Sequence, residues 1–498
     1  MNNRFNLVEE PWIPLADHDR VSLRQIFSPP GYRSLGGNAV QKISLLKLLL
    51  AIAQSAETPR DETELRLLGV QGLRDHCLLY LDRWHDRFYL YGERPFLQMP
   101  AISSARVQSF GAVLPDVSTG NTTVLSQIQV QQTLDDAEKA LLLVTQMGFA
   151  LSGKKADNKV VLSPRYAGKR NEKGKPSTAK PGPSVAHMGL LHNFLLGQEI
   201  SQTLWLNVLT REQIAQMGIF SEGLGIAPWE QMPEGEACGQ ARRLQHSLLG
   251  RLVPVCRFCL LNEDGLHYSE GIAHPDYRAG MVDPSVAIDQ SLKKPKVLWA
   301  DPDRRPWREL TSLLSFFEQE GGQGFQSWQL RFGLGRARDE IAEFAIWSGG
   351  LKVSSNAGEQ YVSGRDDFVE SQVWLQSSML GTMWFTQLKF EMEALDALAK
   401  GLYGRVTSFH KEQKVNEPRL AARATHLFWQ LCERDFQQLV DCCEQNESAK
   451  IQRHNLRIRF AVNILGAYDQ FCPRETARQI DAWAKFRPNN SKYLKQEE

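Results

Sequence analysis

The chain has 498 residues, of which 42 % are hydrophobic and 23 % charged, and its formal net charge is +1. A single hydrophobic core stops growing at roughly 250–300 residues, so this length predicts at least two globular domains. The near-zero charge excludes a uniformly basic nucleic-acid-binding protein, since such proteins carry a basic excess. Any contact with DNA must therefore come from a local patch, or from partners that share the charge.

Eight cysteines are scattered along the chain without a dense framework, which is typical of reduced thiols in the cytosol. The opening sequence MNNRFNLVEEPW lacks a basic region followed by an apolar one. The longest apolar run, residues 43–53, is too short to span a bilayer and contains Lys47. We therefore expect a cytoplasmic protein with no membrane partner.

The first 150 residues predict a mixture of strands and helices. Short apolar runs broken by prolines predict strands and turns over residues 1–30. Residues 38–55 lack glycine and proline and fit a largely buried helix, whereas residues 82–91 alternate aromatic and charged side chains as a half-buried hairpin would. Residues 135–151 predict a second helix, with Asp135 as its N-cap.

Residues 153–182 form a cationic segment. Nine lysines and arginines are opposed there only by Asp157 and Glu172, and glycines and prolines interrupt the segment. This composition predicts a loop, and its charge favours contact with a phosphate backbone over a merely solubilising insertion. The residues expected to contact phosphates are Lys169, Arg170, Lys173 and Lys175.

Residues 310–348 are predicted to be helical, and a small polar loop flanked by glycines follows at residues 349–358. Small residues let a backbone approach a ligand closely, so this loop fits the narrow minor groove of DNA. The pattern alone fits a hairpin turn equally well.

Beyond about residue 375 the sequence becomes helical throughout. The four amphipathic segments lie near 384–402, 420–439, 451–471 and 475–486. Joined by short loops, they predict a four-helix bundle. The fold class is therefore α+β, with a large mixed α/β domain at residues 1–374 and the bundle at residues 375–498. Arg453 and Arg457 are four residues apart and share one helical face, a pattern typical of an ordinary solvated face.

The sequence contains no P-loop, HExxH zinc motif or GxSxG nucleophile elbow, so we expect no enzyme. Cys256 and Cys259 form one CxxC pair, which is half of a four-ligand zinc site, and no second pair exists. We expect both cysteines to be core thiols, and we expect no metal and no cofactor.

Several sequence blocks carry a resemblance to a known family. They include FNLVEEPWIPL at 5–15, RPFLQMP at 94–100, LPDVSTGNTTVL at 114–125, GLHYSEGIAHPDY at 265–277 and SSNAGEQYVSGRDDFVES at 354–371. In this order they resemble the CasA family, the large subunit of the type I-E CRISPR Cascade surveillance complex. The resemblance implies a mixed α/β domain followed by a four-helix bundle.

The resemblance also implies a function. Such a subunit is non-catalytic and reads a protospacer-adjacent motif (PAM) in double-stranded target DNA through the minor groove. It then helps to open the duplex for pairing with a guide RNA and recruits a helicase-nuclease. The implied partners are this DNA, the guide RNA, the helicase-nuclease, and the backbone, small and guide-end-capping subunits of the complex.

Residue roles are implied by the same resemblance. The family's glutamine-wedge hairpin falls on Ser354, Ser355, Asn356 and Ala357, where no glutamine occupies the tip and Gln360 lies further along. Lys352 could hold the adjacent phosphate. The family's lysine finger falls near residues 274–278, where Arg278 is the only long cation. Its glycine loop falls on Ala179, Lys180 and Gly182. Its loop for guide RNA or subunit contact falls on Asn121, Thr122, Thr123, Val124, Leu125, Ser126 and Gln127.

Two alternatives stay open. The chain could be a scaffold that only bridges other members of a complex, or an uncharacterised nuclease with a split active site. Full target binding by a complex that lacks this chain would favour the scaffold. Metal-dependent DNA cleavage by the isolated chain would favour the nuclease.

Overall fold

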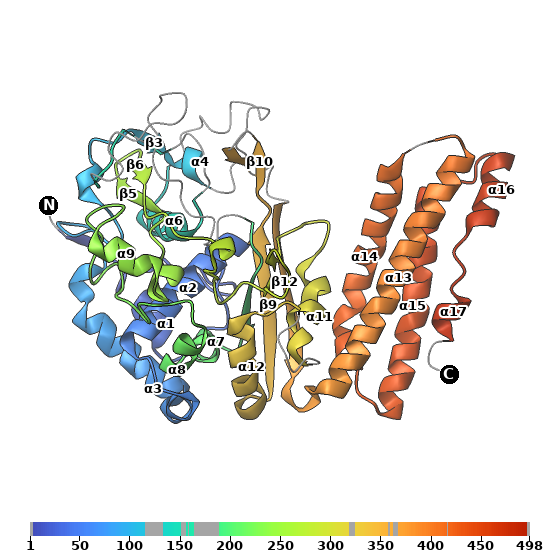
Figure 1. Cartoon of the computed structure of the whole chain (residues 1–498), viewed down its shortest axis with the longest axis horizontal. Helices are drawn as coiled ribbons and strands as arrows, with labels where there is room; N and C mark the ends of the chain where they lie inside the picture. The colour runs from blue at the N-terminus through green and yellow to red at the C-terminus, as the bar shows by residue number, and fades with distance from the viewer. Residues whose placement is uncertain are drawn as a thin grey trace. The chain divides into compact units, whose positions relative to one another are not determined.

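The computed structural model describes most of the chain as two compact units. The described residues are 3–114, 133–150, 156–157, 159–163, 189–317, 324–356, 359–361, 367–415 and 417–495. The units are Met1–Trp307 with Gln323–Gln372, and Arg308–Gly322 with Val373–Glu498. The first mixes helices with small sheets and the second is mostly helical (Figure 1), which confirms the predicted α+β class.

Helix α2 (Ala39–Ala56) is the central helix of the first unit, and it confirms the helix predicted over residues 38–55. Asn38 caps it, because its side chain accepts a hydrogen bond from Gln41 N while the Gln41 side chain accepts one from Asn38 N. Helix α6 (Asp136–Gly148) and strand β9 (Glu343–Leu351) pack against it. Among the described residues only α2 is long and apolar enough to cross a membrane, and its burial marks it as a core helix.

The remaining helices of the first unit surround this core. They are α1 (Leu23–Phe27), α3 (Glu62–Arg83), α4 (Phe110–Val113), α7 (Ile200–Asn207), α8 (Arg211–Gln216), α9 (Gly239–Gln245), α10 (Leu249–Leu252) and α12 (Trp328–Glu340). Asp135 caps α6 with Glu138, so the predicted N-cap is confirmed.

The strands form small sheets of two or three strands. They are β1 (Arg4–Asn6), β2 (Tyr89–Tyr91), β3 (Val107–Ser109), β4 (His192–Leu196), β5 (Arg257–Leu261), β6 (Gly265–Glu270), β7 (Ile288–Asp289), β8 (Lys296–Val297), β10 (Ser354–Asn356), β11 (Glu359–Tyr361) and β12 (Phe368–Gln376). The three-stranded sheets have the orders β12–β9–β4 and β3–β6–β5, and the pairs β1–β2, β7–β8 and β10–β11 stand apart. Strands β4 and β9 are antiparallel, with His192 opposite Gly349.

Several predicted elements differ from the structure. The hairpin expected over residues 82–91 is the end of α3, a 3₁₀ helix at His85–Arg87 and the short strand β2. Leu73, Cys77 and Leu81 are buried at helical spacing, which carries the helix through Arg83. Residues 1–30, predicted as strands and turns, also contain α1, which Ser22 caps.

The helix predicted over residues 310–348 is wrong beyond α12, because β9 occupies residues 343–351. The run Phe344, Ala345, Ile346 and Trp347 is buried. A strand covered on both faces is apolar throughout, so its sequence loses the alternation that separates a strand from a buried helix. Gly349 and Gly350, which were expected in a loop, are part of this strand.

In the second unit, each of the four segments predicted as helices is helical. They are α13 (Thr382–Glu412), α14 (Pro418–Asp441), α15 (Glu447–Phe471) and α16 (Ala477–Phe486). Helix α14 packs against α13 and α15, while the shorter α16 packs against α13. Helix α11 (Leu310–Leu313) also contacts α13, so residues 308–322 belong with these helices. Helix α17 (Ser491–Leu494) contacts α15.

Candidate nucleic-acid interface

Three of the four predicted wedge residues, Ser354, Ser355 and Asn356, form strand β10 of a two-stranded hairpin that follows β9. Strands β10 and β11 are antiparallel, with Ser354 opposite Tyr361, Ser355 opposite Gln360 and Asn356 opposite Glu359. Residues that face each other across such a ladder share one side of the hairpin. Gln360, which the sequence places after the wedge position, is therefore level with Ser355.

The base of this hairpin is held by close backbone contacts. Gly189 has φ +79°, and a Cβ there would lie 3.2 Å from both Leu351 O and Val353 N. A Cβ on Gly350 would lie 2.7 Å from Leu190 O and 2.9 Å from the Ala300 Cβ. Side chains larger than hydrogen do not fit at these two positions without displacing the backbone.

Lys352 is at the point where β9 ends and the hairpin begins. Its backbone N–H donates to Asp367 O at 2.8 Å, and its Nζ lies 3.4 Å from Asp301 Oδ1. Both side chains of this ion pair are more than 40 % exposed. A surface pair of this kind contributes little to stability, so the ammonium can exchange the carboxylate for a phosphate. This geometry is compatible with the role predicted for Lys352.

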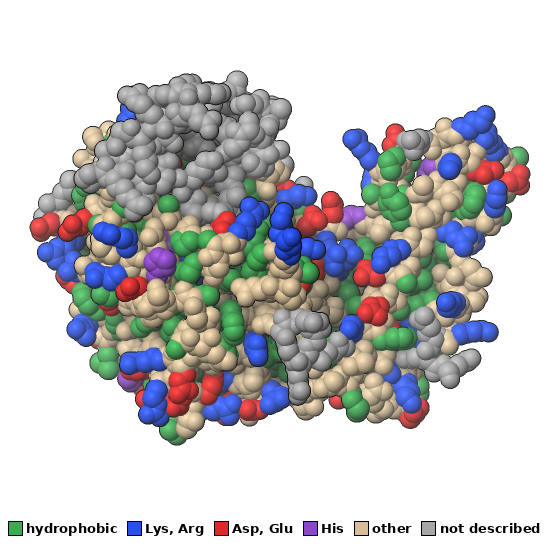
Figure 2. All heavy atoms as spheres, in the orientation of Figure 1, with side chains coloured by type: hydrophobic (Ala, Val, Ile, Leu, Met, Phe, Trp, Pro, Cys, Tyr) green, Lys and Arg blue, Asp and Glu red, His purple; other side chains and the backbone are tan. Residues whose placement is uncertain are grey.

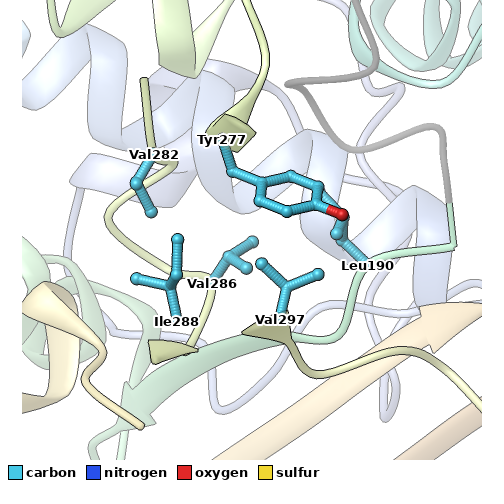
Figure 3. Close-up of a cluster of buried hydrophobic side chains, with 6 residues drawn as sticks. All are labelled: Leu190, Tyr277, Val282, Val286, Ile288 and Val297. Atoms are coloured by element: carbon cyan, nitrogen blue, oxygen red, sulfur yellow. The ribbon is translucent and has the colours of Figure 1, made fainter. Parts of the chain in front are cut away.

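Arg278 is presented on a short turn above a buried apolar cluster. The cluster consists of Leu190, Tyr277, Val282, Val286, Ile288 and Val297. Figure 3 shows the ring of Tyr277 lying among the aliphatic side chains, which come from the turn, β7, β8 and the segment before β4. Because Tyr277 is anchored in this way, the backbone of the next residue, Arg278, has a fixed place.

Hydrogen bonds fix the same turn. The Asp276 carboxylate accepts from Arg278 N at 3.0 Å and from Ala279 N at 3.1 Å. The Arg278 side chain is exposed, and its Nε donates to Tyr277 Oη at 3.2 Å. This hydrogen bond raises the pKa of Arg278, whose guanidinium is charged in any case. The structure thus places the predicted finger residue as an exposed cation on a rigid support.

Three lysines on the neighbouring β7–β8 hairpin were not among the site residues predicted from the sequence. Lys293, Lys294 and Lys296 are exposed, and within the described part of the chain none of them forms an ion pair. Ile288 and Val297 pair across this hairpin and belong to the apolar cluster beneath Arg278. The signal was the run LKKPK at 292–296, with three lysines in four residues.

On the viewed face, acidic and basic side chains are interspersed (Figure 2), as expected for a net charge of +1. A phosphate backbone is attracted by local excesses of positive charge. Arg278, Lys352 and the β7–β8 lysines are the candidates for phosphate contacts, with Asp301 as the acidic partner of Lys352.

Several predicted site residues lie outside the described residues. They are Asn121, Thr122, Thr123, Val124, Leu125, Ser126, Gln127, Lys169, Arg170, Lys173, Lys175, Ala179, Lys180, Gly182 and Ala357. Ser355 and Asn356 are described only by their backbone, and Ser354 is half-buried. Their assignments remain predictions.

Cys256 and Cys259 are both fully buried, as expected for core thiols. Burial raises the pKa of each thiol to about 12, which disfavours the thiolate that a metal requires. The described residues include no group of three or more potential metal ligands. A metal-free protein remains our prediction.

A buried polar network in the first unit resembles a catalytic triad in composition only. Ser285 Oγ donates to Asp283 Oδ1 at 2.7 Å, and His192 Nδ1 lies 2.8 Å from Ser285 Oγ, so the carboxylate contacts the serine and not the histidine. Burial lowers the pKa of His192 to about 3. Burial opposes ionisation of Asp283, but its ion pair with Lys47 lowers the pKa to about 2. With all four residues buried, the network has a structural role.

Arg453 and Arg457 do not form a solvated face, so that prediction is wrong. Their side chains are 2 % and 0 % exposed. Arg457 donates from Nη2 and Nε to the two carboxylate oxygens of Glu391 at 2.6 Å and 3.0 Å, and Arg453 Nη1 donates to Cys442 O and Glu444 O. Both arginines hold the helices of the second unit together and are not available to nucleic acid.

A family model, a curated protein and solved structures all place the chain with the same group of proteins. Residues 6–464 match the family model of the CRISPR-associated protein Cse1. A curated protein of Thermus thermophilus, CRISPR-associated protein CasA/Cse1, is 27 % identical over 354 residues, which is 64 % of this chain. The match spans 61 % of that relative's length.

Solved structures match over nearly the whole chain. Thermobifida fusca Cse1 has a TM-score of 0.75 at 21 % identity, covering 99 % of this chain and 98 % of its own. Thermus thermophilus CasA has 0.72 at 21 %, covering 97 % and 98 %. A chain of a CRISPR RNA-guided surveillance complex has 0.67 at 16 %, covering 98 % and 99 %. At these identities the likeness shows a shared fold.

Proposed function

Because the chain belongs to the Cse1 family of CRISPR-associated proteins, we propose that it is the large, non-catalytic subunit of an RNA-guided surveillance complex. In this role it reads a PAM in double-stranded DNA through the minor groove and opens the adjacent base pairs. Guide RNA then pairs with the target strand, and the complex recruits a helicase-nuclease. In this division of labour, base pairing with the guide RNA recognises the target sequence, and the protein recognises the short flanking motif.

One observation carries the proposal beyond family membership. The first unit brings a protruding hairpin, the rigidly mounted cation Arg278 and three lysines onto one continuous support, the cluster around Tyr277 and Leu190. Phosphate contacts from such cations position a protein on a duplex, and a slender hairpin fits a minor groove.

A library of duplexes with randomised bases beside the target tests this function. We expect the complete complex to enrich particular flanking bases at least tenfold, and the same complex lacking this chain to enrich none, because direct and shape readout would reside in this chain. The measurement is sequencing of the bound DNA. If the complex lacking this chain enriched the same flanking bases equally well, the chain would have only a scaffolding role.

The salt dependence of DNA binding tests the cationic contacts. Replacing Lys293, Lys294 and Lys296 with alanine should reduce the slope of log K against log salt by about two to three, since each phosphate contact contributes about 0.9. Replacing Lys169, Arg170, Lys173 and Lys175 with alanine should also flatten it. Both effects should be the same for every DNA sequence.

The control is alanine at the exposed Lys400, Lys411 and Lys414 of the second unit, which removes the same charge elsewhere. An unchanged slope in the β7–β8 variant would mean that the hairpin lysines do not contact phosphates. An equal change in this control would mean that they act only through the overall charge of the protein.

A further inference from the structure

Trp299, which follows β8, is unusually exposed for a tryptophan. Its side chain is 46 % accessible, whereas most other tryptophans of the first unit are buried. Its ring contacts Tyr277 edge-on, with 6.3 Å between ring centroids and an interplanar angle of 74°. Tyr277 is itself anchored in the apolar cluster (Figure 3). The tryptophan ring therefore packs against an anchored tyrosine on one side and is exposed to solvent on the other.

The position of Trp299 links the two candidate DNA-contacting elements. Through its backbone it forms a β-bridge with Leu190, whose carbonyl lies against Gly350 at the base of the wedge hairpin. Two residues later, Asp301 pairs with Lys352. On the other side, Tyr277 precedes Arg278. The exposed ring thus contacts the tyrosine that precedes the arginine, and its backbone pairs with the residue that packs against the foot of the hairpin.

An aromatic ring among cations has a specific use with nucleic acids. Bases inside a duplex are stacked on one another and present only their edges, so a ring cannot stack on them. A base that has lost its partner exposes a π-face, and stacking on an aromatic side chain is worth about 1–3 kcal/mol whatever the base. A platform next to a strand-opening hairpin would receive such bases at the moment of opening.

We propose that Trp299 is a stacking platform for an unpaired nucleobase beside the wedge hairpin. This inference rests on the proposed function, because it requires a duplex that is opened at this surface. The platform stabilises the opened state and not the closed duplex. Its loss should therefore weaken binding only where unpaired bases are formed.

The test uses the complete guide-RNA complex with Trp299→Leu and Trp299→Phe. The leucine variant keeps an apolar side chain without a π-face, and the phenylalanine variant keeps the ring. On a target with two mismatched bases beside the PAM, we expect Trp299→Leu to weaken binding about tenfold and Trp299→Phe by less than threefold. Leu292→Ala, which removes another exposed apolar side chain from the same hairpin, is the control and should bind like the wild type.

Fluorescence locates the stacked base. 2-Aminopurine placed in the target DNA beside the PAM, or at the facing end of the guide RNA, should be quenched in the wild type and brighter in Trp299→Leu. A change with either probe supports the platform and names the strand that it holds. Equal affinity and equal fluorescence in wild type and Trp299→Leu would overturn it.

A loss shared by Trp299→Leu and Trp299→Phe, accompanied by a lower unfolding temperature, would also overturn it in favour of a packing role. Failure of the proposed function looks different. In that case the wild-type complex would show no preference among flanking bases, whatever residue stands at position 299.

Discussion

Replacing residues 354–357 with a single glycine should slow R-loop formation on a fully paired target more than tenfold, and far less on a target with mismatched bases beside the PAM. Opening a base step costs a few kcal/mol, and each 1.4 kcal/mol is a factor of ten. Mismatches remove that cost in advance. The fold should survive, because β10 and β11 form a separate two-stranded sheet and join no larger sheet among the described residues.

R-loop rates on both targets, with wild-type and shortened complexes, measure the effect. Glycines at Glu263 and Asp264, in the exposed turn between β5 and β6, provide a control hairpin of the same unit. Gln360→Ala should reproduce part of the loss if the amide level with Ser355 enters the duplex. Equal slowing on paired and mismatched targets would show that the hairpin does not open DNA.

Replacing Glu391 with alanine should lower the free energy of unfolding of the second unit by about 3–5 kcal/mol. Its carboxylate is 1 % exposed and accepts two hydrogen bonds from Arg457, with Arg453 4.0 Å away. Removing it takes a buried carboxylate away from two buried guanidinium groups, and the loss of one partner from a buried ion pair is among the largest penalties available to a point mutation.

Hydrogen exchange of the amides in α13, α14 and α15 measures this effect separately from the first unit, whose unfolding would complicate a denaturant curve. The matched control is Glu393→Ala, which removes the same charge from an exposed position two residues along α13 and should change stability by less than about 0.5 kcal/mol. A difference between the two variants below about 1 kcal/mol would contradict a structural role for the ion pair.

Several helices could be predicted from sequence signals that lie close together in the chain. The caps at Asn38 and Asp135 and the apolar faces behind them determine where α2 and α6 begin, since those signals lie within a few residues of each other. The change to a helical second unit was visible for the same reason. The resemblance to the CasA family then supplied the functional hypothesis, which no single motif carried.

The elements and contacts that could not be predicted depend on interactions between residues far apart in the chain. Strand β9 is covered on both faces, so its apolar run resembled a helix. The spacing of Arg453 and Arg457 indicates a shared face but not what covers it, because Glu391 lies 66 residues before Arg457. Trp299 and Arg278 are likewise neighbours only through Tyr277.

The close fit of Gly189 and Gly350 against their neighbours has a consequence for exchanging parts between relatives. A Cβ on Gly350 would lie under 3.0 Å from Leu190 O and the Ala300 Cβ, and a Cβ on Gly189 would lie 3.2 Å from Leu351 O and Val353 N. An added methyl group at either glycine therefore requires these neighbours to shift. A hairpin transplanted without the segments at Leu190 and Ala300 would pack against different neighbours at its base. Its orientation would then change, whatever residues form its tip. A graft that alters motif preference should therefore carry three pieces together: residues 189–191, 297–301 and 349–361.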